Sequence, residues 1–287
     1  MRKAAFALSF LLALLCGCAP PAPAEPESPP EASPATSKAE FLPALTPLVE
    51  LSTPAETAEG RAQGNYELPK KMFYDPVTED DFPALLAELP EANAAFYGLD
   101  WDKALIRWGD SVAEFDWPWL TPRQILPRLY CFDLDHDWED ELIVVCHPGT
   151  GTGVSIDDLH VLEKNLDGTL TDYALPREFF SEDMSEALSV RTLNGRTYSI
   201  LGAELVDVTS LLPEDAAPEN IEGFCTGDII NFAITPEPEF NWEHIRVRSA
   251  ASLCGEGFSP TLSYAAEVDA VVLYQDGVFT LSQIHLS

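Results

Sequence analysis

The sequence is poor in positive charge, and this lack limits what the protein binds. Its 287 residues include 16 Lys and Arg against 48 Asp and Glu, which gives a formal net charge of −32. Nucleic-acid binding depends on Lys and Arg side chains that meet phosphates, and attraction to an anionic bilayer surface depends on the same side chains. The composition therefore argues against a nucleic-acid partner and against a domain that lies flat on a membrane.

The sequence also lacks the common signatures of catalysis and of zinc binding. It contains no C-x-x-C, H-E-x-x-H, G-x-S-x-G or S-x-x-K motif. Ser155, His147 or His160, and Asp157 would supply a serine triad, but any acidic β-rich chain offers such trios. The many acidic residues give the carboxylate pair of a glycoside hydrolase no distinctive spacing. A non-enzymatic role is favoured, and a surface hydrolase with scattered catalytic carboxylates stays open as the alternative.

The glycine-rich segment 147–153, HPGTGTG, is interpreted as a hairpin loop. A phosphate-binding loop needs a helix after the glycines, because the helix N-terminus supplies the anion site. The residues that follow, VSIDDLHVLE, have the composition of a strand.

The N-terminus has the pattern of an export signal. Arg2 and Lys3 precede the apolar stretch 4–15, which is too short to span a bilayer. The stretch ends in Leu-Cys-Gly-Cys at 15–18, which resembles a bacterial lipobox. The resemblance implies cleavage of residues 1–17, diacylation of Cys18, and a protein anchored to the cell membrane on its extracytoplasmic side. An ordinary secretory signal is the alternative.

Residues 18–65 are expected to form a disordered tether. The segment 19–36 is rich in Pro, Ala and Glu and has almost no core-forming side chains, so it cannot bury enough surface to offset its ordering entropy. Loss of residues 1–17 removes two positive charges, so the net charge changes from −32 to −34. The remaining residues, 66–287, are assigned to an extracytoplasmic domain.

Four cysteines lie within that domain, at Cys131, Cys146, Cys225 and Cys254. An exported chain with an even number of cysteines favours disulfides. Nearest-neighbour pairing would give Cys131–Cys146 and Cys225–Cys254. Buried, reduced cysteines are the alternative, because a free thiol packs as a small apolar group.

The domain is expected to be mainly β, with antiparallel sheets arranged as a sandwich or a partial propeller. From residue 103 onward, short apolar runs alternate with Gly, Asn, Asp and Pro. Asn194-Gly195 and Asp276-Gly277 each separate two such runs and predict tight hairpin turns. Thr78 begins a capping-box pattern, and the following residues 81–99 predict one or two short helices. A second short helix is expected at 181–188, capped by Ser181, and an α+β fold is the alternative class.

The most charged segment is DLDHDWEDEL, residues 133–142. Carboxylates at alternate positions of a tight loop can surround a hard cation. Asp133, Asp135 and Asp137 have this spacing, but Val144 stands where an EF-hand needs its last glutamate. Strand-like segments rather than helices flank the loop, so an EF-hand is excluded and an acidic turn without metal is the simplest alternative.

Glu141 at the ninth position completes a D-x-D-x-D-x-x-x-E pattern, which resembles the calcium loop of FG-GAP/VCBS repeats. The similarity extends to NLDGTLTDY at 165–173 and covers residues 130–174 only. It implies a blade-like β unit that binds structural calcium through the side chains of Asp133, Asp135, Asp137 and Glu141 and the carbonyl of Glu139. Trp138 stands where the family has glycine, so we expect a looser site.

Four tryptophans, Trp101, Trp108, Trp117 and Trp119, are the best sequence hint of a binding face. Large aromatic residues are more often buried, so a core role is the favoured interpretation. Taken together, the sequence predicts a membrane-anchored extracytoplasmic lipoprotein that acts as a binding or interaction module with one calcium loop. Its partner would be a surface glycan, a protein or a peptide.

Overall fold

The computed structural model describes residues 49–50, 58–72, 77–119, 125–175, 177, 179, 184, 188–201, 204–213, 217, 220–237, 242–255 and 264–287. They are mainly β, as expected. The strands are β1 (Val49–Glu50), β2 (Ala58–Gly60), β3 (Ala84–Leu89), β4 (Ala94–Asp100), β5 (Lys103–Trp108), β6 (Ser111–Phe115), β7 (Arg128–Phe132), β8 (Glu141–Gly151), β9 (Val154–Lys164), β10 (Leu170–Ala174), β11 (Val190–Leu193), β12 (Arg196–Leu201), β13 (Glu204–Asp207), β14 (Ile221–Glu237), β15 (Trp242–Gly255), β16 (Tyr264–Gln275) and β17 (Val278–Leu286).

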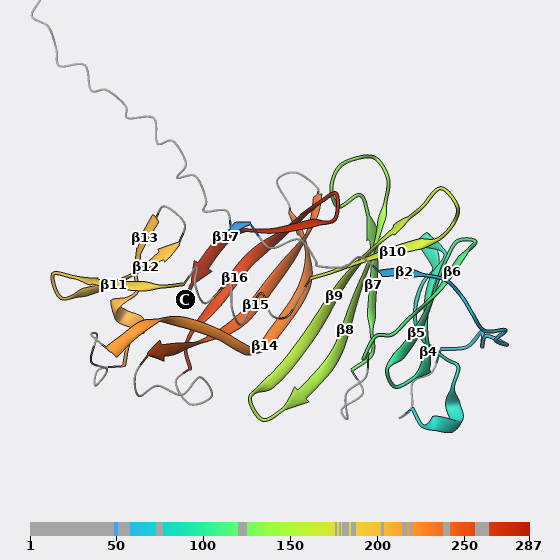
Figure 1. Cartoon of the computed structure of the whole chain (residues 1–287), viewed down its shortest axis with the longest axis horizontal. Helices are drawn as coiled ribbons and strands as arrows, with labels where there is room; N and C mark the ends of the chain where they lie inside the picture. The colour runs from blue at the N-terminus through green and yellow to red at the C-terminus, as the bar shows by residue number, and fades with distance from the viewer. Residues whose placement is uncertain are drawn as a thin grey trace, which may run out of the picture. The chain divides into compact units, whose positions relative to one another are not determined.

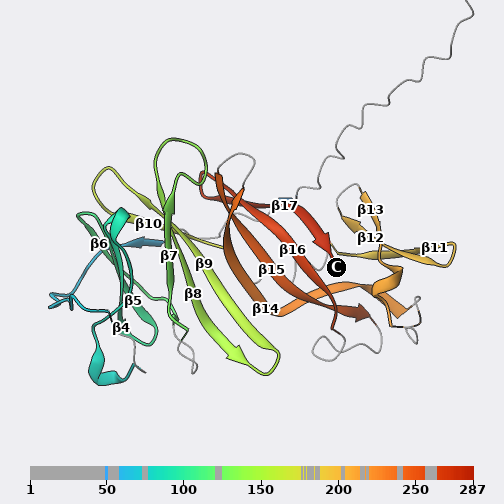
Figure 2. The same cartoon turned by 180° about the vertical axis from the view of Figure 1, so that it is seen from behind.

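The strands form three sheets (Figures 1 and 2). The ten-stranded sheet has the order β1-β17-β16-β15-β14-β9-β10-β2, with β8 between β7 and β9. The smaller sheets are β3-β4-β5-β6 and β11-β12-β13. Pairing is antiparallel except between β14 and β9. Consecutive pairing of β7, β8, β9 and β10 gives a four-stranded antiparallel meander.

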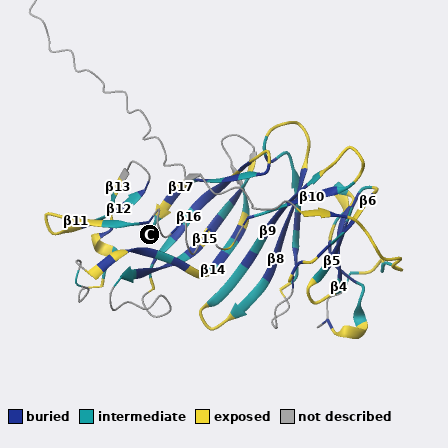
Figure 3. Cartoon of the chain, in the orientation of Figure 1, coloured by how far each residue is buried: buried dark blue, intermediate teal, exposed yellow. Residues whose placement is uncertain are grey.

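Strands β8 and β9 are buried on both faces. Successive side chains of a strand point to opposite sides, and Ile143 and Val145 enter one core cluster with residues of β14–β17. Leu142 and Val144 enter a second cluster with residues of the four-stranded sheet. This double burial explains why the segment LIVVC is continuously apolar instead of alternating. Figure 3 shows the buried central strands and their exposed turns.

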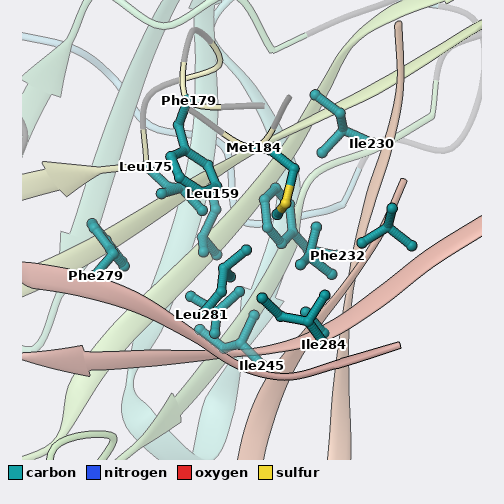
Figure 4. Packing of buried hydrophobic residues seen from close by; sticks show 14 of the residues in the cluster. Leu159, Leu175, Phe179, Met184, Ile230, Phe232, Ile245, Phe279, Leu281 and Ile284 are labelled. Atoms are coloured by element: carbon teal, nitrogen blue, oxygen red, sulfur yellow. The ribbon is translucent and has the colours of Figure 1, made fainter. Parts of the chain in front are cut away.

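Figure 4 shows the first cluster from close by, with side chains from β9, β14, β15 and β17 pointing toward one another. Phe179 and Met184, from the segment between β10 and β11, complete this core. Most of the helix expected at 181–188, including Ser181, lies outside the described residues. The N–H of Leu188 donates to the Met184 carbonyl at 3.0 Å, a bond with helical spacing.

The helices expected over residues 81–99 are wrong, because this segment forms β3 and β4. Only the capping box is confirmed: Asp81 accepts from the N–H and the hydroxyl of Thr78, at the start of a 3-10 turn. Residues rich in Ala, Leu and Glu favour a helix locally. Here Phe96 packs in one cluster and Tyr97 in another, so burial on two faces overrides the local preference.

Both hairpin predictions are confirmed. Asn194 and Gly195 have φ of 52° and 76° between β11 and β12. Asp276 and Gly277 have φ of 49° and 80° between β16 and β17. Asn, Asp and Gly tolerate these left-handed angles, so the local sequence alone specifies the turns. The loop predicted at 147–153 is mostly strand, because residues 147–151 belong to β8 and only Thr152 and Gly153 form the turn before β9.

Two short segments of the expected tether, residues 18–65, form strands. Strand β1 pairs with β17, and β2 pairs with β10, so both belong to the sheet. A Cβ at Gly60 would lie 2.5 Å from the Phe115 ring, which shows how closely β2 approaches β6. Residues 1–18, with the expected signal and Cys18, lie outside the described residues, and none of the described helices is long and apolar enough to cross a membrane.

One of the two expected disulfides is present. Cys225 and Cys254 are bonded on the paired strands β14 and β15, with Cα atoms 5.7 Å apart. Cys131 and Cys146 are free. Cys131 lies opposite Leu142, four residues from Cys146 along β8. At about 3.4 Å per residue their Cα atoms are too far apart for a disulfide. Burial raises the pKa of the Cys131 thiol to about 11.

Candidate functional site

The acidic loop joins β7 to β8 at the end of the meander (Figure 1). It brings together part of the predicted ligand set. Carboxylate oxygens of Asp133, Asp135 and Glu141 all lie within 4.8 Å of one another. The strands fix this convergence, because Asp133 directly follows β7 and Glu141 begins β8 opposite Phe132.

Backbone N–H groups of the loop orient these carboxylates. Asp133 accepts from the N–H of Asp137 at 3.0 Å and from the N–H of Trp138 at 3.2 Å. Glu141 accepts from the N–H of Leu134 at 2.7 Å. The chain thus wraps around its own acidic side chains and holds them on the inside of the turn.

One predicted side-chain ligand, Asp137, stands apart from this cluster. The Asp137 carboxylate accepts from the N–H of Glu139 at 2.8 Å and is not among the three convergent groups. Glu139 was expected to act through its carbonyl, and its exposed side chain lines the neighbouring cavity. The spacing in the sequence predicted four convergent carboxylates, whereas three converge in the structure.

Trp138 stands where the similar FG-GAP/VCBS calcium loop has glycine, and its backbone adopts a left-handed conformation. Its φ is 78°, and that of His136 is 65°. A non-glycine residue in this region costs about 1–2 kcal/mol. The indole remains 94% exposed, so packing does not offset that cost. Trp138 thus fits the turn with some backbone strain.

Glu141 is the buried member of the cluster, with 3% of its surface exposed. The pKa of its carboxyl is raised to about 7, chiefly by burial and also by the charges of Asp135, Asp137 and Glu163. Among the described residues, no Lys or Arg forms an ion pair with Glu141. A buried carboxylate without a positive partner is costly, and a bound cation would supply that partner.

A cavity of about 470 Å³ adjoins the cluster. Eight acidic residues line it, with Lys164, Trp108, Cys131 and Ala92; the acidic residues are Glu91, Asp135, Asp137, Glu139, Asp140, Glu141, Glu163 and Asp276. The Lys164 ammonium lies 3.7 Å from the centre of the Trp108 ring. Glu91, Glu163 and Asp276 were not predicted as site residues, because the tertiary fold brings them in from distant segments.

The tryptophans do not form an open binding face. Trp108, Trp117 and Trp119 are buried, which confirms the core interpretation and corrects the other. The indole N–H of Trp119 donates to the Asp100 carbonyl, and that of Trp117 donates to the Asp172 carboxylate. Only Trp101 is partly exposed, at 37%, and its ring meets Phe82 edge-on.

Ser155, His147 and Asp157 are not arranged as a catalytic serine triad. His147 Nδ1 lies 2.6 Å from Asp157, and both side chains are buried. Ser155 instead donates to the side-chain oxygen of Asn231 at 3.0 Å. His147 Nε2 is buried and has no hydrogen-bond partner among the described residues. His160 bonds to Asp172 in a separate buried pair.

The site therefore consists of a three-carboxylate cluster beside an acidic cavity, presented by β7, β8 and β9 and by the β16–β17 turn. No family model, curated protein or solved structure matches this chain.

Proposed function

We propose that the protein is a lipid-anchored, extracytoplasmic binding module whose acidic loop holds a structural calcium ion. The observation that carries the calcium part is the convergence of Asp133, Asp135 and Glu141 within 4.8 Å. Calcium takes oxygen ligands at about 2.3–2.6 Å, so oxygens on opposite sides of one ion lie about 4.8 Å apart. The donor set is all oxygen and includes a buried carboxylate, which suits a hard cation. A bound ion would neutralise the mutual repulsion of these groups and hold β7 and β8 together at the loop.

The calcium site can be tested by thermal unfolding of the chelated protein. Adding calcium at about 100 times its dissociation constant should stabilise the fold by about 2.7 kcal/mol and raise the Tm. Asp135→Ala should remove that rise, because it deletes one of the three convergent carboxylates. Asp80→Ala is the matched control, since Asp80 is exposed and distant in sequence from the loop. An equal calcium response in both variants, or none in the parent chain, would leave the loop as a metal-free turn.

The lipid anchor is tested separately. Cys18→Ser should release the protein from the membrane fraction of the producing cells, because diacylation would have no acceptor. Cys16→Ser is the control, since Cys16 follows Leu15 and does not fit the lipobox cleavage position. Fractionation followed by immunoblotting gives the readout. Retention of Cys18→Ser on the membrane would contradict the anchor.

A surface hydrolase is the second candidate, and the acidic cavity is the observation that favours it. Glu141, whose pKa is raised to about 7, lies in that cavity with Glu163, and such a carboxyl can act as a general acid. A cation site without its ion has the same property, because clustered carboxylates raise one another's pKa. Turnover of a glycan or peptide that Glu141→Gln abolishes would favour the hydrolase over the binding module.

A further inference from the structure

Two exposed apolar side chains, Trp138 and Leu166, lie on turns close in sequence to residues that line the acidic cavity, Asp137 and Lys164. Trp138 is 94% exposed in the acidic loop, and Leu166 is fully exposed in the β9–β10 turn. Neither gains stability from packing, and Trp138 occupies a backbone conformation that would favour glycine. Exposed aromatic and apolar residues beside polar ones are typical of protein contact sites.

These side chains lie on loops at one end of the sheet. The loop end consists of residues 133–140, 165–169 and 276–277, and Figures 1 and 2 show the three turns at the same end. Leu142 lies opposite Leu162, so the acidic loop and the β9–β10 turn leave the same end of neighbouring strands. The N–H of Asp276 lies 3.5 Å from the Asp135 carboxylate, which places the third turn beside the first.

The cavity at this end is suited to a positively charged group. Its lining has eight acidic residues against one lysine. The chain's own Lys164 already places its ammonium on the Trp108 ring in this cavity, at 3.7 Å from the ring centre. An aromatic face that carries an ammonium among carboxylates is a recognition surface for Lys and Arg side chains. The net charge of −32 would also speed the approach of a cationic partner.

We propose that the loop end docks a basic, amphipathic polypeptide segment. Its Lys or Arg side chains enter the acidic cavity, and its apolar side chains contact Trp138 and Leu166. This inference rests on the proposed function as a binding module and names the class of its partner. It does not depend on calcium occupancy, because Glu91 and Asp276 line the cavity but are not among the three convergent carboxylates.

The test measures fluorescence anisotropy of a short labelled Lys/Leu peptide with the full chain, in calcium and in chelator. Trp138→Gly should weaken binding at least about tenfold, a factor that corresponds to about 1.4 kcal/mol. Leu205→Ser, which removes an exposed apolar side chain from the three-stranded sheet, should leave binding unchanged. The double variant Glu91→Gln/Asp276→Asn should weaken binding and reduce its salt dependence, whereas Glu222→Gln, on exposed β14 surface, should change neither.

The proposal is overturned if a control peptide with Glu in place of every Lys binds equally well, or if the Trp138→Gly variant binds the Lys/Leu peptide as tightly as the Leu205→Ser variant does. Calcium-dependent binding to anionic phospholipid vesicles without peptide binding would also overturn it and assign the surface to a membrane. Trp138→Gly should keep the calcium-induced rise in Tm, since glycine suits the turn. Loss of peptide binding with that rise intact supports the docking surface, and absence of the rise in the parent chain contradicts only the calcium site.

Discussion

Replacing Asp157 with alanine is expected to destabilise the protein by about 2–6 kcal/mol, because two buried donors lose their acceptor at about 1–3 kcal/mol each. The carboxylate is 4% exposed and accepts from His147 Nδ1 at 2.6 Å, Arg128 Nη2 at 2.7 Å and the N–H of Phe232 at 2.9 Å. These donors come from β8, β7 and β14, and Asp157 itself belongs to β9. Removing the acceptor leaves buried donors unsatisfied and loosens the strands that carry the acidic loop.

Urea unfolding at fixed calcium concentration measures this effect. Asp158→Ala is the matched control. Asp158 follows Asp157 in the chain, and its carboxylate accepts hydrogen bonds from Arg177 nearer the surface. A partly exposed pair of this kind contributes about 1 kcal/mol or less. Equal losses of stability in the two variants would show that Asp157 does not hold the four strands together.

Replacing Glu141 with glutamine is expected to change how stability depends on pH in the absence of calcium. The folded-state pKa of Glu141 is raised from 4.5 to about 7, so the folded chain binds the proton more tightly than the unfolded chain. Stability of the parent protein should therefore fall as pH rises from 4.5 through 7, by about 3 kcal/mol in total. Glu141→Gln lacks this loss, and at pH 8 in chelator it should be the more stable protein.

Unfolding at a series of pH values in chelator, with and without added calcium, provides the measurement. Calcium should restore the parent protein at pH 8, because the ion replaces the proton as the neutralising charge, and it should have much less effect on Glu141→Gln. Glu222→Gln is the control for loss of an exposed carboxylate. Parallel pH profiles for the parent chain and Glu141→Gln would contradict the assigned role of Glu141.

Features set by a few neighbouring residues could be predicted from the sequence. The turns at Asn194-Gly195 and Asp276-Gly277 form where expected, since left-handed angles are accessible to these residues. The position of the acidic loop between two strands could also be predicted from the residues next to it in the sequence. Trp138 was expected to loosen the site; its backbone takes a positive φ, and the residue is exposed to solvent.

Features that depend on partners distant in the sequence could not be predicted in this way. Residues 84–100 have a helical composition, yet they form strands because two core clusters bury their opposite faces. Cys131 and Cys146 looked like a pair until the register of β7 and β8 placed them four residues apart. Residues 58–60 were assigned to the tether, but they form β2, which pairs with the edge of β10 and so belongs to the sheet.

The sequence by itself determined the mainly β class, the hairpin turns and an acidic loop that presents carboxylates at alternate positions. Only the tertiary structure decided which carboxylates converge, that Glu141 is buried among them, and that Glu91, Glu163 and Asp276 complete an acidic cavity. The physical reason is the range of the forces involved. Turn geometry depends on the dihedral preferences of two or three residues, whereas burial and electrostatic coupling depend on strands that meet only after the chain has folded.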